Sequence, residues 1–309
     1  ITATDHLIDL GHRRIGFLAG RPDLDSARLR EQGYYDALAT AGIEHQRSSD
    51  NGVGGGYYKN WDTGFISKDL LAHEYNHSWN GKYRRGADLW TPNFNTPMRN
   101  SLLWVYEGQT QYYGHVLAAR SGFVSKQQAL DLIANNAAIY DTRTGRDWRP
   151  LADTTMDPII AARRSLPWQN WQRSEDYYSE GQLIWMDVDT LIRERSGNKR
   201  SLDDFAKAFF GVNDGDWGTL TYTRKDVVAA LNKVEPYEWE AFLKARVDDV
   251  AKTAPLAGLE RGALLLRGAL FSAFHLATTL VPWKLPEHAS WAYMLTFVLL
   301  DAVYYVQHR

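Results

Sequence analysis

The chain has 309 residues, 44% of them apolar and 23% charged, which is typical of a globular protein of one large or two ordinary domains. Its formal net charge of −2 lacks the basic excess of nucleic-acid-binding proteins, so nucleic acid is excluded as an expected partner. Cysteine is absent, which rules out disulfides, thiolate metal sites and cysteine nucleophiles.

The first segment, residues 1–41, is predicted to form a helix, a strand and a second helix. TATDHLIDLGH has helical spacing, RRIGFLAG is an apolar, β-rich run, and DSARLREQGYYDALATAG starts at an N-cap, Asp25 or Ser26. This αβα order is typical of a parallel sheet. HLIDLGHRRIGFLAG and RLREQGYYDAL resemble a small part of the effector-binding domain of the lactose-repressor and galactose-repressor family. A sugar-binding module built on this fragment is one alternative for function.

The central part of the chain is predicted to be mostly helical, because capping signals punctuate its apolar periodicity. In SLDDFAKAFFG, Ser201 is the expected N-cap and Asp204 follows three residues later. TRKDVVAALNKV repeats this arrangement with Thr223 and Asp226. Pro236 is expected in the first turn of the next helix. The loop GADLWTPNFNTPMRN separates helices, and the pair Arg84-Arg85 before it is interpreted as solvated charge.

The last segment, residues 263–309, contains two apolar stretches. ALLLRGALFSAFHLATTLV has nineteen residues and ASWAYMLTFVLLDAVYYV has eighteen. Each is close to the ~20 residues that cross a bilayer, and a pair of buried helices is the other interpretation. WAYMLTFVLLDAVYYVQHR resembles the first histidine-box region of the sterol desaturase and fatty acid hydroxylase family.

The motif HEYNH places two histidines one helical turn apart. His73 and His77 are at positions i and i+4, so on a helix they share a face and can bind one ion together. Imidazole nitrogens suit zinc, and a catalytic zinc site needs three protein ligands and one open position. Glu74 lies beside the pair, where its carboxylate can take a proton from the attacking water and return it to the leaving amine.

A second helix offers the third ligand. SLLWVYEGQTQYYG places Leu102, Tyr106 and Tyr113 on one helical stripe, with Glu107 projecting from the adjacent turn. Gly108 follows directly, and a glycine inside a helix costs stability that close packing would justify. Glu107 is therefore the predicted third ligand, on a helix packed against that of the histidines.

Longer stretches resemble the glycyl aminopeptidase family of gluzincin metallopeptidases. HEYNHSWNGKYRRGADLWTP, LLWVYEGQTQYYGHVLAARSG and DYYSEGQLIWMDVDTLIRERSGNKRSLDDF carry this resemblance, which runs over residues 42–262. It implies a thermolysin-like core in which His73, His77 and Glu107 hold one zinc ion and Glu74 is the general base. The β-domain and PDZ module that usually flank such a core have no counterpart in this sequence.

Two further roles follow from the same resemblance. The family carries a Gly-x-x-Glu motif upstream of the histidines, and GIEH fits it with Glu44, whose carboxylate would pair with the α-ammonium of a substrate. Its Y-x-x-G motif falls on Tyr178, ahead of Gly181, and implies a hydroxyl that stabilises the oxyanion. The neighbouring Tyr177 stays open as the alternative for this role.

The sequence as a whole predicts an α+β, mostly α protein in three parts: an αβα fragment at 1–41, a zinc aminopeptidase core at 42–262 and an apolar helical tail at 263–309. The expected function is zinc-dependent hydrolysis of the N-terminal peptide bond of peptides, with glycine or small residues preferred as the resemblance implies. An inactive or membrane-anchored mosaic of three fragments is the other alternative. A periplasmic or membrane-associated location in a bacterium is favoured, with membrane contact through the tail, and the oligomeric state is left open.

Overall fold

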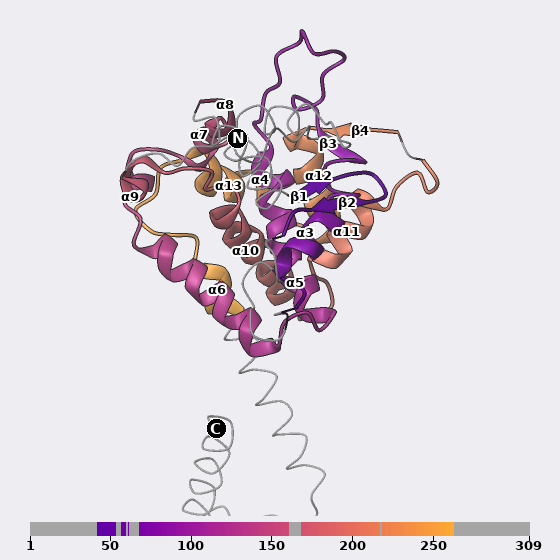
Figure 1. Ribbon diagram of the computed structural model, residues 1–309. Coiled ribbons are helices and arrows are strands. Elements are labelled where there is room, and N and C mark those ends of the chain that lie inside the picture. The colour runs from indigo at the N-terminus through magenta and orange to yellow at the C-terminus, as the bar shows by residue number, and fades with distance from the viewer. Residues whose placement is uncertain are drawn as a thin grey trace, which may run out of the picture. The chain divides into compact units, whose positions relative to one another are not determined.

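The structure is a computed structural model that describes residues 42–53, 57–59, 61, 68–160, 168–216 and 218–262 (Figure 1). The chain divides into two compact units, 1–261 and 262–309, and the described residues lie almost wholly in the first. The predicted αβα fragment and the two apolar stretches of the tail lie outside the described residues. Within the described residues, no helix is long and apolar enough to cross a membrane.

Helices dominate the described chain, as predicted. They are α3 (Asp69–Asn76), α4 (Leu103–Tyr106), α5 (Gly108–Arg120), α6 (Lys126–Asp141), α7 (Leu151–Thr154), α8 (Asp157–Ile160), α9 (Gln169–Gln172), α10 (Ser179–Arg195), α11 (Leu202–Phe210), α12 (Arg224–Val234) and α13 (Trp239–Leu243). A 3₁₀ turn at Gly145–Asp147 precedes α7, and a π turn at Lys244–Asp248 follows α13. The mostly α, α+β class is confirmed.

Four short strands form two separate pairs. β1 (Gly42–Glu44) and β2 (Ser49–Asn51) are antiparallel, with Ile43 opposite Asp50. β3 (Arg84–Gly86) and β4 (Leu220–Tyr222) are parallel, and they join the segment after α3 to the segment before α12. The β1–β2 pair packs on α3, so it borders the helix that carries the HEYNH motif.

The main core lies around α10, whose side chains are buried along most of its length. Trp185 from α10 stacks on Trp104 from α4, with ring centroids 5.8 Å apart. Its indole N–H donates to the Trp104 carbonyl oxygen at 2.9 Å. Figure 1 shows α3, α5 and α10 at the centre of the described part, and α5 packs against both of the others.

Glycines permit this close packing of α5 between α3 and α10. A Cβ added to Gly108 would lie 2.8 Å from the Gly181 Cα and 2.7 Å from the Tyr177 carbonyl oxygen, so α5 and α10 touch backbone to backbone. A Cβ on Gly114 would lie 3.2 Å from the His73 Cβ, so α3 is almost as close. The expectation that close packing explains the glycine after Glu107 is confirmed.

Replacement of Gly108 by alanine is expected to force α5 and α10 apart. Overpacking of this kind lowers the free energy of unfolding by ~1–3 kcal/mol. The better helix propensity of alanine offsets ~1 kcal/mol of this loss. Because Gly108 follows Glu107, we also expect weaker metal binding, measured by chelator competition. Gly122→Ala is the control, since an added Cβ there meets no atom within 4 Å although its φ of +79° is unfavourable for alanine. Equal metal affinity in both variants would contradict the prediction.

The predicted capping boxes are confirmed in α11 and α12. The Ser201 hydroxyl accepts from the backbone N–H of Asp203, and the Asp204 carboxylate accepts from the Ser201 N–H at 2.8 Å. At α12, the Asp226 carboxylate accepts from the Thr223 N–H at 2.7 Å. Each box satisfies N–H groups that have no partner inside the helix, which is why both helices begin where the sequence predicts.

Two sequence interpretations are wrong. Pro236 lies before the next helix and not in its first turn, because α13 begins only at Trp239. The backbone at Glu235 is extended (φ −144°, ψ 111°), and the Trp239 indole N–H donates to the Glu235 carbonyl oxygen at 2.7 Å. Arg84 is 9% exposed and is not a solvated charge. Its guanidinium lies 4.2 Å from the ring centroid of Phe209, where stacking on the aromatic face compensates for burial.

Candidate metal centre

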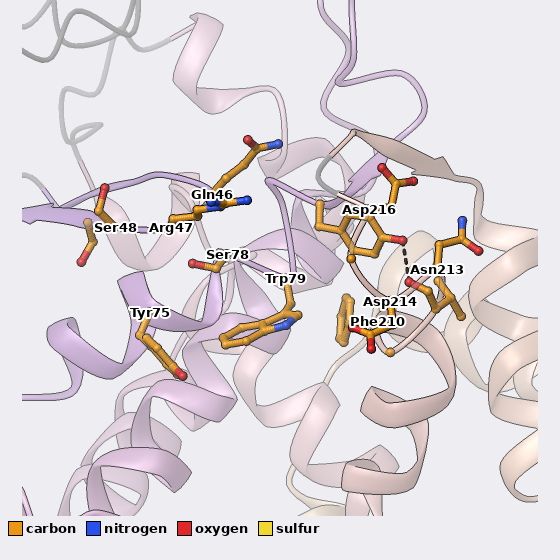
Figure 2. Close-up of a pocket in the computed structure, with 15 residues that line it drawn as sticks. Gln46, Arg47, Ser48, Tyr75, Ser78, Trp79, Phe210, Asn213, Asp214 and Asp216 are labelled. Atoms are coloured by element: carbon orange, nitrogen blue, oxygen red, sulfur yellow. Dashed lines mark hydrogen bonds between the residues drawn. The ribbon is translucent and has the colours of Figure 1, made fainter.

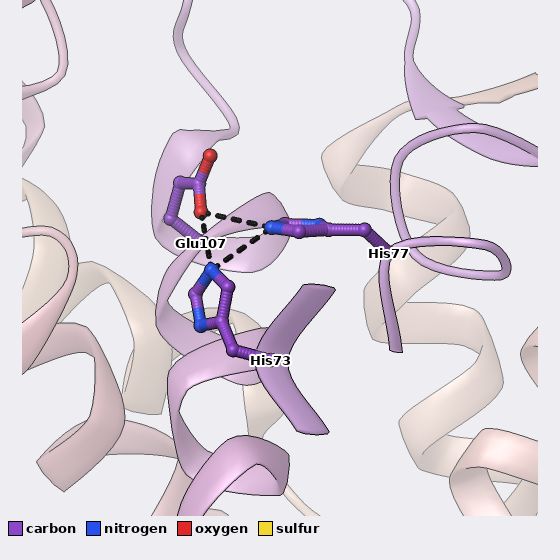
Figure 3. A group of neighbouring side chains, drawn as sticks. All are labelled: His73, His77 and Glu107. Carbon is purple, nitrogen blue, oxygen red and sulfur yellow. Dashed lines mark hydrogen bonds and ion pairs between the residues drawn. The ribbon is translucent and has the colours of Figure 1, made fainter. Parts of the chain in front are cut away.

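His73 and His77 project from one face at the carboxyl end of α3. Both are buried, and their Nε2 atoms lie 2.9 Å apart. The Oε2 atom of Glu107 lies 3.3 Å from each of these nitrogens. Figure 3 shows the three side chains converging on one point, as the sequence predicts for a ligand set. Among the described residues, no other three histidine, aspartate or glutamate side chains lie close enough together to share one ion.

Glu107 lies at the junction of α4 and α5. Its N–H donates to the Leu103 carbonyl at 2.7 Å and its carbonyl accepts from the Gln111 N–H at 2.7 Å, so the chain stays nearly helical there. The break lets the side chain face α3 while both helices bury their apolar residues. The predicted stripe around Glu107 is therefore divided between two helices.

Hydrogen bonding fixes which nitrogen of His77 carries a proton. Its Nδ1 lies 2.9 Å from the carbonyl oxygen of Asn80, and a carbonyl can only accept, so Nδ1 donates. In the neutral ring Nε2 then presents a lone pair, which is aimed at the carboxylate of Glu107. Two acceptors at this distance repel unless a proton or a metal ion lies between them, so the geometry calls for a cation.

Electrostatics at the cluster favour a positive charge. Burial alone would lower the pKa of His77, but the Glu107 carboxylate outweighs it and raises that pKa to about 9. Burial alone would raise the pKa of Glu107, but His77 and His73 hold it well below its usual range. Apart from the two imidazoles 3.3 Å away, the buried Glu107 Oε2 atom has no hydrogen-bond partner within the described residues. Two imidazoles and one carboxylate in this setting fit a divalent metal ion.

Asn80, which the sequence analysis did not identify, supports the cluster from outside. It is fully buried, and its amide donates to the Val105 carbonyl at 2.9 Å and to the Thr110 hydroxyl at 3.1 Å. The backbone carbonyl of Asn80 accepts the hydrogen bond that orients His77. Asn80 thus ties the end of α3 to α4 and α5, and such outer partners orient metal ligands. A single buried amide leaves no pattern in a sequence.

Glu74 lies next to His73 on α3, packed against β1. A Cβ added to Gly42 would lie 2.0 Å from the Glu74 Oε1 atom, so a side chain at position 42 would displace this carboxylate. The side chain is 5% exposed, and its Oε2 atom has no hydrogen-bond partner within the described residues. Burial raises the pKa of Glu74 to about 7, although His77 and His73 act in the opposite direction.

Glu44 reaches the cluster from β1. Its Oε1 atom accepts a hydrogen bond of 2.5 Å from the Tyr106 hydroxyl and lies 3.0 Å from the Lys82 ammonium. The Tyr106 ring packs 4.9 Å from the ring of His77. Burial would raise the pKa of Glu44, but His77 and Lys82 together lower it, so the carboxylate is held ionised. Sequence reasoning placed Glu44 near the site and missed both Tyr106 and Lys82.

The two candidate tyrosines occupy different environments. Tyr177 is 2% exposed and belongs to the main core. Tyr178 is only partly buried, and its ring stacks on that of His73 with centroids 6.1 Å apart. Of the alternatives left open by the sequence, Tyr178 is therefore the residue that lies beside the cluster.

A separate pocket of about 770 Å³ lies beside the carboxyl end of α3 and the turn that follows it (Figure 2). It is bordered by the β1–β2 turn, the segment after α11 and the rings of Tyr75 and Trp79, whose centroids are 5.0 Å apart. None of the three residues His73, His77 and Glu107 lines this pocket. The pocket and the metal cluster are thus distinct features.

Comparisons with known sequences agree with two of the three predicted resemblances. The M61 glycyl aminopeptidase family matches residues 67–184, which hold the HEYNH motif, Glu107 and the start of α10. A periplasmic binding protein-like domain matches residues 4–74. The HTH-type transcriptional regulator GalR of Escherichia coli (strain K12) is 56% identical over 41 residues, which are 13% of this chain and 12% of that protein. The resemblance of the tail to sterol desaturases stays a prediction.

A solved structure has a similar fold. It is an aminopeptidase N family protein from Idiomarina loihiensis, matched with a TM-score of 0.53 and 18% sequence identity over 78% of this chain. The match covers 46% of that protein, so this chain spans less than half of its length. The likeness shows that the mostly helical α+β fold resembles that of an aminopeptidase, and the matched M61 segment is the part that contains the metal cluster.

Proposed function

We propose that this protein is a zinc-dependent aminopeptidase of the M61 type, which removes the N-terminal residue from peptides. The observation that carries the proposal is the convergence of His73, His77 and Glu107 on one point, with Glu74 on the same helix. All four lie in the segment that matches the M61 family. The preference for glycine or small residues rests on that resemblance.

His73, His77 and Glu107 would hold the zinc ion, with Asn80 orienting His77. When bound, zinc supplies Lewis-acid chemistry that polarises the scissile carbonyl. Glu74 accepts the proton of the attacking water and passes it to the nitrogen of the leaving amine. Its burial supports this role, because a carboxylate with raised proton affinity near neutral pH is a better base than a solvated one.

Tyr178 would donate a hydrogen bond to the oxygen that gains negative charge in the tetrahedral transition state. This role is supported by the position of Tyr178, which lies at the start of α10 with its ring stacked on that of His73. A donor that acts mainly on developing charge lowers the barrier more than it strengthens substrate binding. This makes Tyr178 a catalytic residue and leaves Tyr177 as part of the core.

The proposed activity is tested by metal content and hydrolysis of a glycyl-anilide. We expect one zinc per chain, release of the aniline, and loss of both after dialysis against a chelator. The N-acetylated anilide should be cleaved far more slowly, since it lacks the α-ammonium group. A chain that binds no zinc, or that cleaves the glycyl-anilide equally well with chelator present, would refute the proposal.

Glu44 is expected to set the preference for a free amino terminus. In Glu44→Gln, kcat/KM for glycyl substrates should fall ~10- to 100-fold, since a hydrogen bond between charged groups contributes ~1.5–3 kcal/mol. Cleavage of an acetylated substrate should not change. Asp50→Asn on β2 is the control, because this exposed carboxylate contacts His45 and not the cluster. Equal losses on both substrates would assign Glu44 a structural role, with Lys82 and Tyr106 as its partners.

A further inference from the structure

The turn that precedes α10 and carries Tyr178 has an unusual backbone. Arg173 and Glu175 have φ angles of +56° and +47°, in the left-handed region that residues other than glycine rarely adopt. Such conformations persist only where the surroundings hold them, and they recur at functional sites. Contacts that hold this turn therefore decide where Tyr178 lies.

Arg173 makes the contacts that hold it. The side chain is 2% exposed, and its Nε donates to the Asp176 Oδ2 atom at 2.8 Å. One terminal nitrogen donates to the Glu180 Oε2 atom at 2.6 Å and the other to the Arg149 carbonyl at 2.6 Å. One guanidinium thus joins the turn, the first helical turn of α10 and the chain before α7.

Two more arginines complete this buried ion cluster. Arg143 donates to the other oxygen of Asp176 at 2.5 Å, and Arg146 lies 3.5 Å from Glu180. Asp176 is fully buried and Glu180 nearly so. Burying ions costs desolvation energy that apolar side chains would avoid, so such a cluster contributes little to stability in itself. What it supplies is a fixed geometry for the two carboxylates and the backbone between them.

That backbone connects directly to Tyr178. The Tyr178 N–H donates to the Glu175 carbonyl at 3.1 Å, and the Tyr178 carbonyl accepts from the Gln182 N–H at 2.8 Å, which starts α10. The ring then stacks on that of His73. We propose that Arg173 is a positioning residue that acts through the 173–178 turn to aim the Tyr178 hydroxyl at the reacting carbonyl. The inference rests on the proposed function, which gives the positioned hydroxyl its catalytic role.

The same turn also touches the metal-ligand helix, which offers a rival route. The Tyr177 carbonyl lies against Gly108, the residue after Glu107. If Arg173 acted through Glu107, loosening the turn would weaken metal binding. If it acts through Tyr178, zinc affinity and KM stay unchanged and only kcat falls.

Arg173→Lys is the variant that separates these routes. Lysine keeps the charge, but a single ammonium cannot bond both carboxylates and the Arg149 carbonyl in the fork geometry of a guanidinium. The matched control is Arg246→Lys, since Arg246 donates to Asp187, a fully buried carboxylate farther along the same helix α10, at 2.7 Å. We expect both variants to lose stability in urea, and only Arg173→Lys to lose kcat, by no more than the ~10²-fold expected for Tyr178→Phe.

A double-mutant cycle tests whether the effect passes through the tyrosine. In the Tyr178→Phe background, Arg173→Lys should lower kcat no further, because the hydroxyl that the turn aims is already absent. Losses that multiply in the double variant would overturn the inference, and so would a fall in zinc affinity in Arg173→Lys alone. If Arg173→Lys fails to fold, Glu180→Gln is the alternative variant, because it keeps the side-chain shape and weakens the Arg173–Glu180 interaction. It should give the same pattern with a smaller fall in kcat.

A readout that needs no turnover keeps this inference separate from the proposed function. With 3-fluorotyrosine at position 178, the parent and Arg246→Lys should each give one sharp ¹⁹F resonance, and Arg173→Lys several or one broadened resonance. An unchanged resonance in Arg173→Lys would overturn the positioning role even in an active enzyme. A parent chain without peptidase activity would instead refute the proposed function, and the ¹⁹F spectra would still decide whether Arg173 fixes Tyr178.

Discussion

Replacement of His77 by alanine is expected to abolish metal binding and, with it, all hydrolysis. The substitution removes one of three ligands and also frees the Asn80 carbonyl that orients it. Loss of an outer partner alone costs 10–100-fold in metal affinity, so loss of the ligand should exceed ~10²-fold. Metal analysis after gel filtration and competition with a chromophoric chelator measure the change.

His45→Ala is the matched control for this variant. His45 is also buried and also has a carboxylate partner, Asp50 at 3.2 Å, but it lies outside the cluster. The control should keep one zinc per chain. Stoichiometric zinc in His77→Ala, or loss of zinc in His45→Ala, would contradict the assignment of ligands.

Metal removal should also lower thermal stability, because a ligand that binds only the folded state stabilises it. At a free zinc concentration ~10³ times the dissociation constant, this contribution is ~4 kcal/mol. The parent chain should therefore melt earlier in the presence of chelator. His77→Ala should show the same melting temperature with and without chelator, since it has no bound metal to lose.

The sequence predicted those parts of the site that depend on one element or on strong spacing rules. On a helix, a separation of four residues places His73 and His77 close together on one face, and α3 has that form. Gly108 signalled close packing because a glycine inside a helix has a cost that packing must offset. The capping boxes of α11 and α12 are local as well, so the starts of these two helices were predicted correctly.

Contacts between distant segments could not be predicted in the same way. Three contacts at the site join residues whose separation along the chain follows no pattern. They are the ion pair of Lys82 with Glu44, the hydrogen bond of His77 to Asn80 and the close approach of Gly42 to Glu74. Pro236 fails for a local reason: the backbone is extended at Glu235, and α13 begins only at Trp239. Local patterns thus predict which groups are available, and packing decides which groups meet.

Glu74→Gln is expected to keep the metal and lose at least ~10²-fold in kcat, since positioned proton transfer contributes 10²–10⁴-fold. Glutamine has the shape of the carboxylate and fits under Gly42, so α3 and its two histidines should not move. The folded protein should also not lose stability, because the variant removes a buried carboxylate whose Oε2 atom has no hydrogen-bond partner within the described residues. Unchanged zinc content with reduced turnover is the expected combination.

Asp69→Asn provides the control on the same helix. Its carboxylate accepts a hydrogen bond of 2.9 Å from Gln111, outside the metal cluster, so this variant should turn over within a few-fold of the parent. Full activity in Glu74→Gln would assign the base to another group. Loss of zinc from Glu74→Gln would show that the carboxylate supports the histidines rather than the reacting water.

The pH profile separates proton transfer from every structural explanation of a lower rate. In the parent, kcat/KM should fall as the pH drops through the pKa of Glu74, because only the ionised carboxylate can accept a proton. Burial places that pKa at about 7, and a bound cation nearby would move it lower by favouring the ionised form. The residual activity of Glu74→Gln should lack this acidic limb, since glutamine does not titrate. An acidic limb that survives the substitution would belong to a different group, and Glu74 would then not be the base.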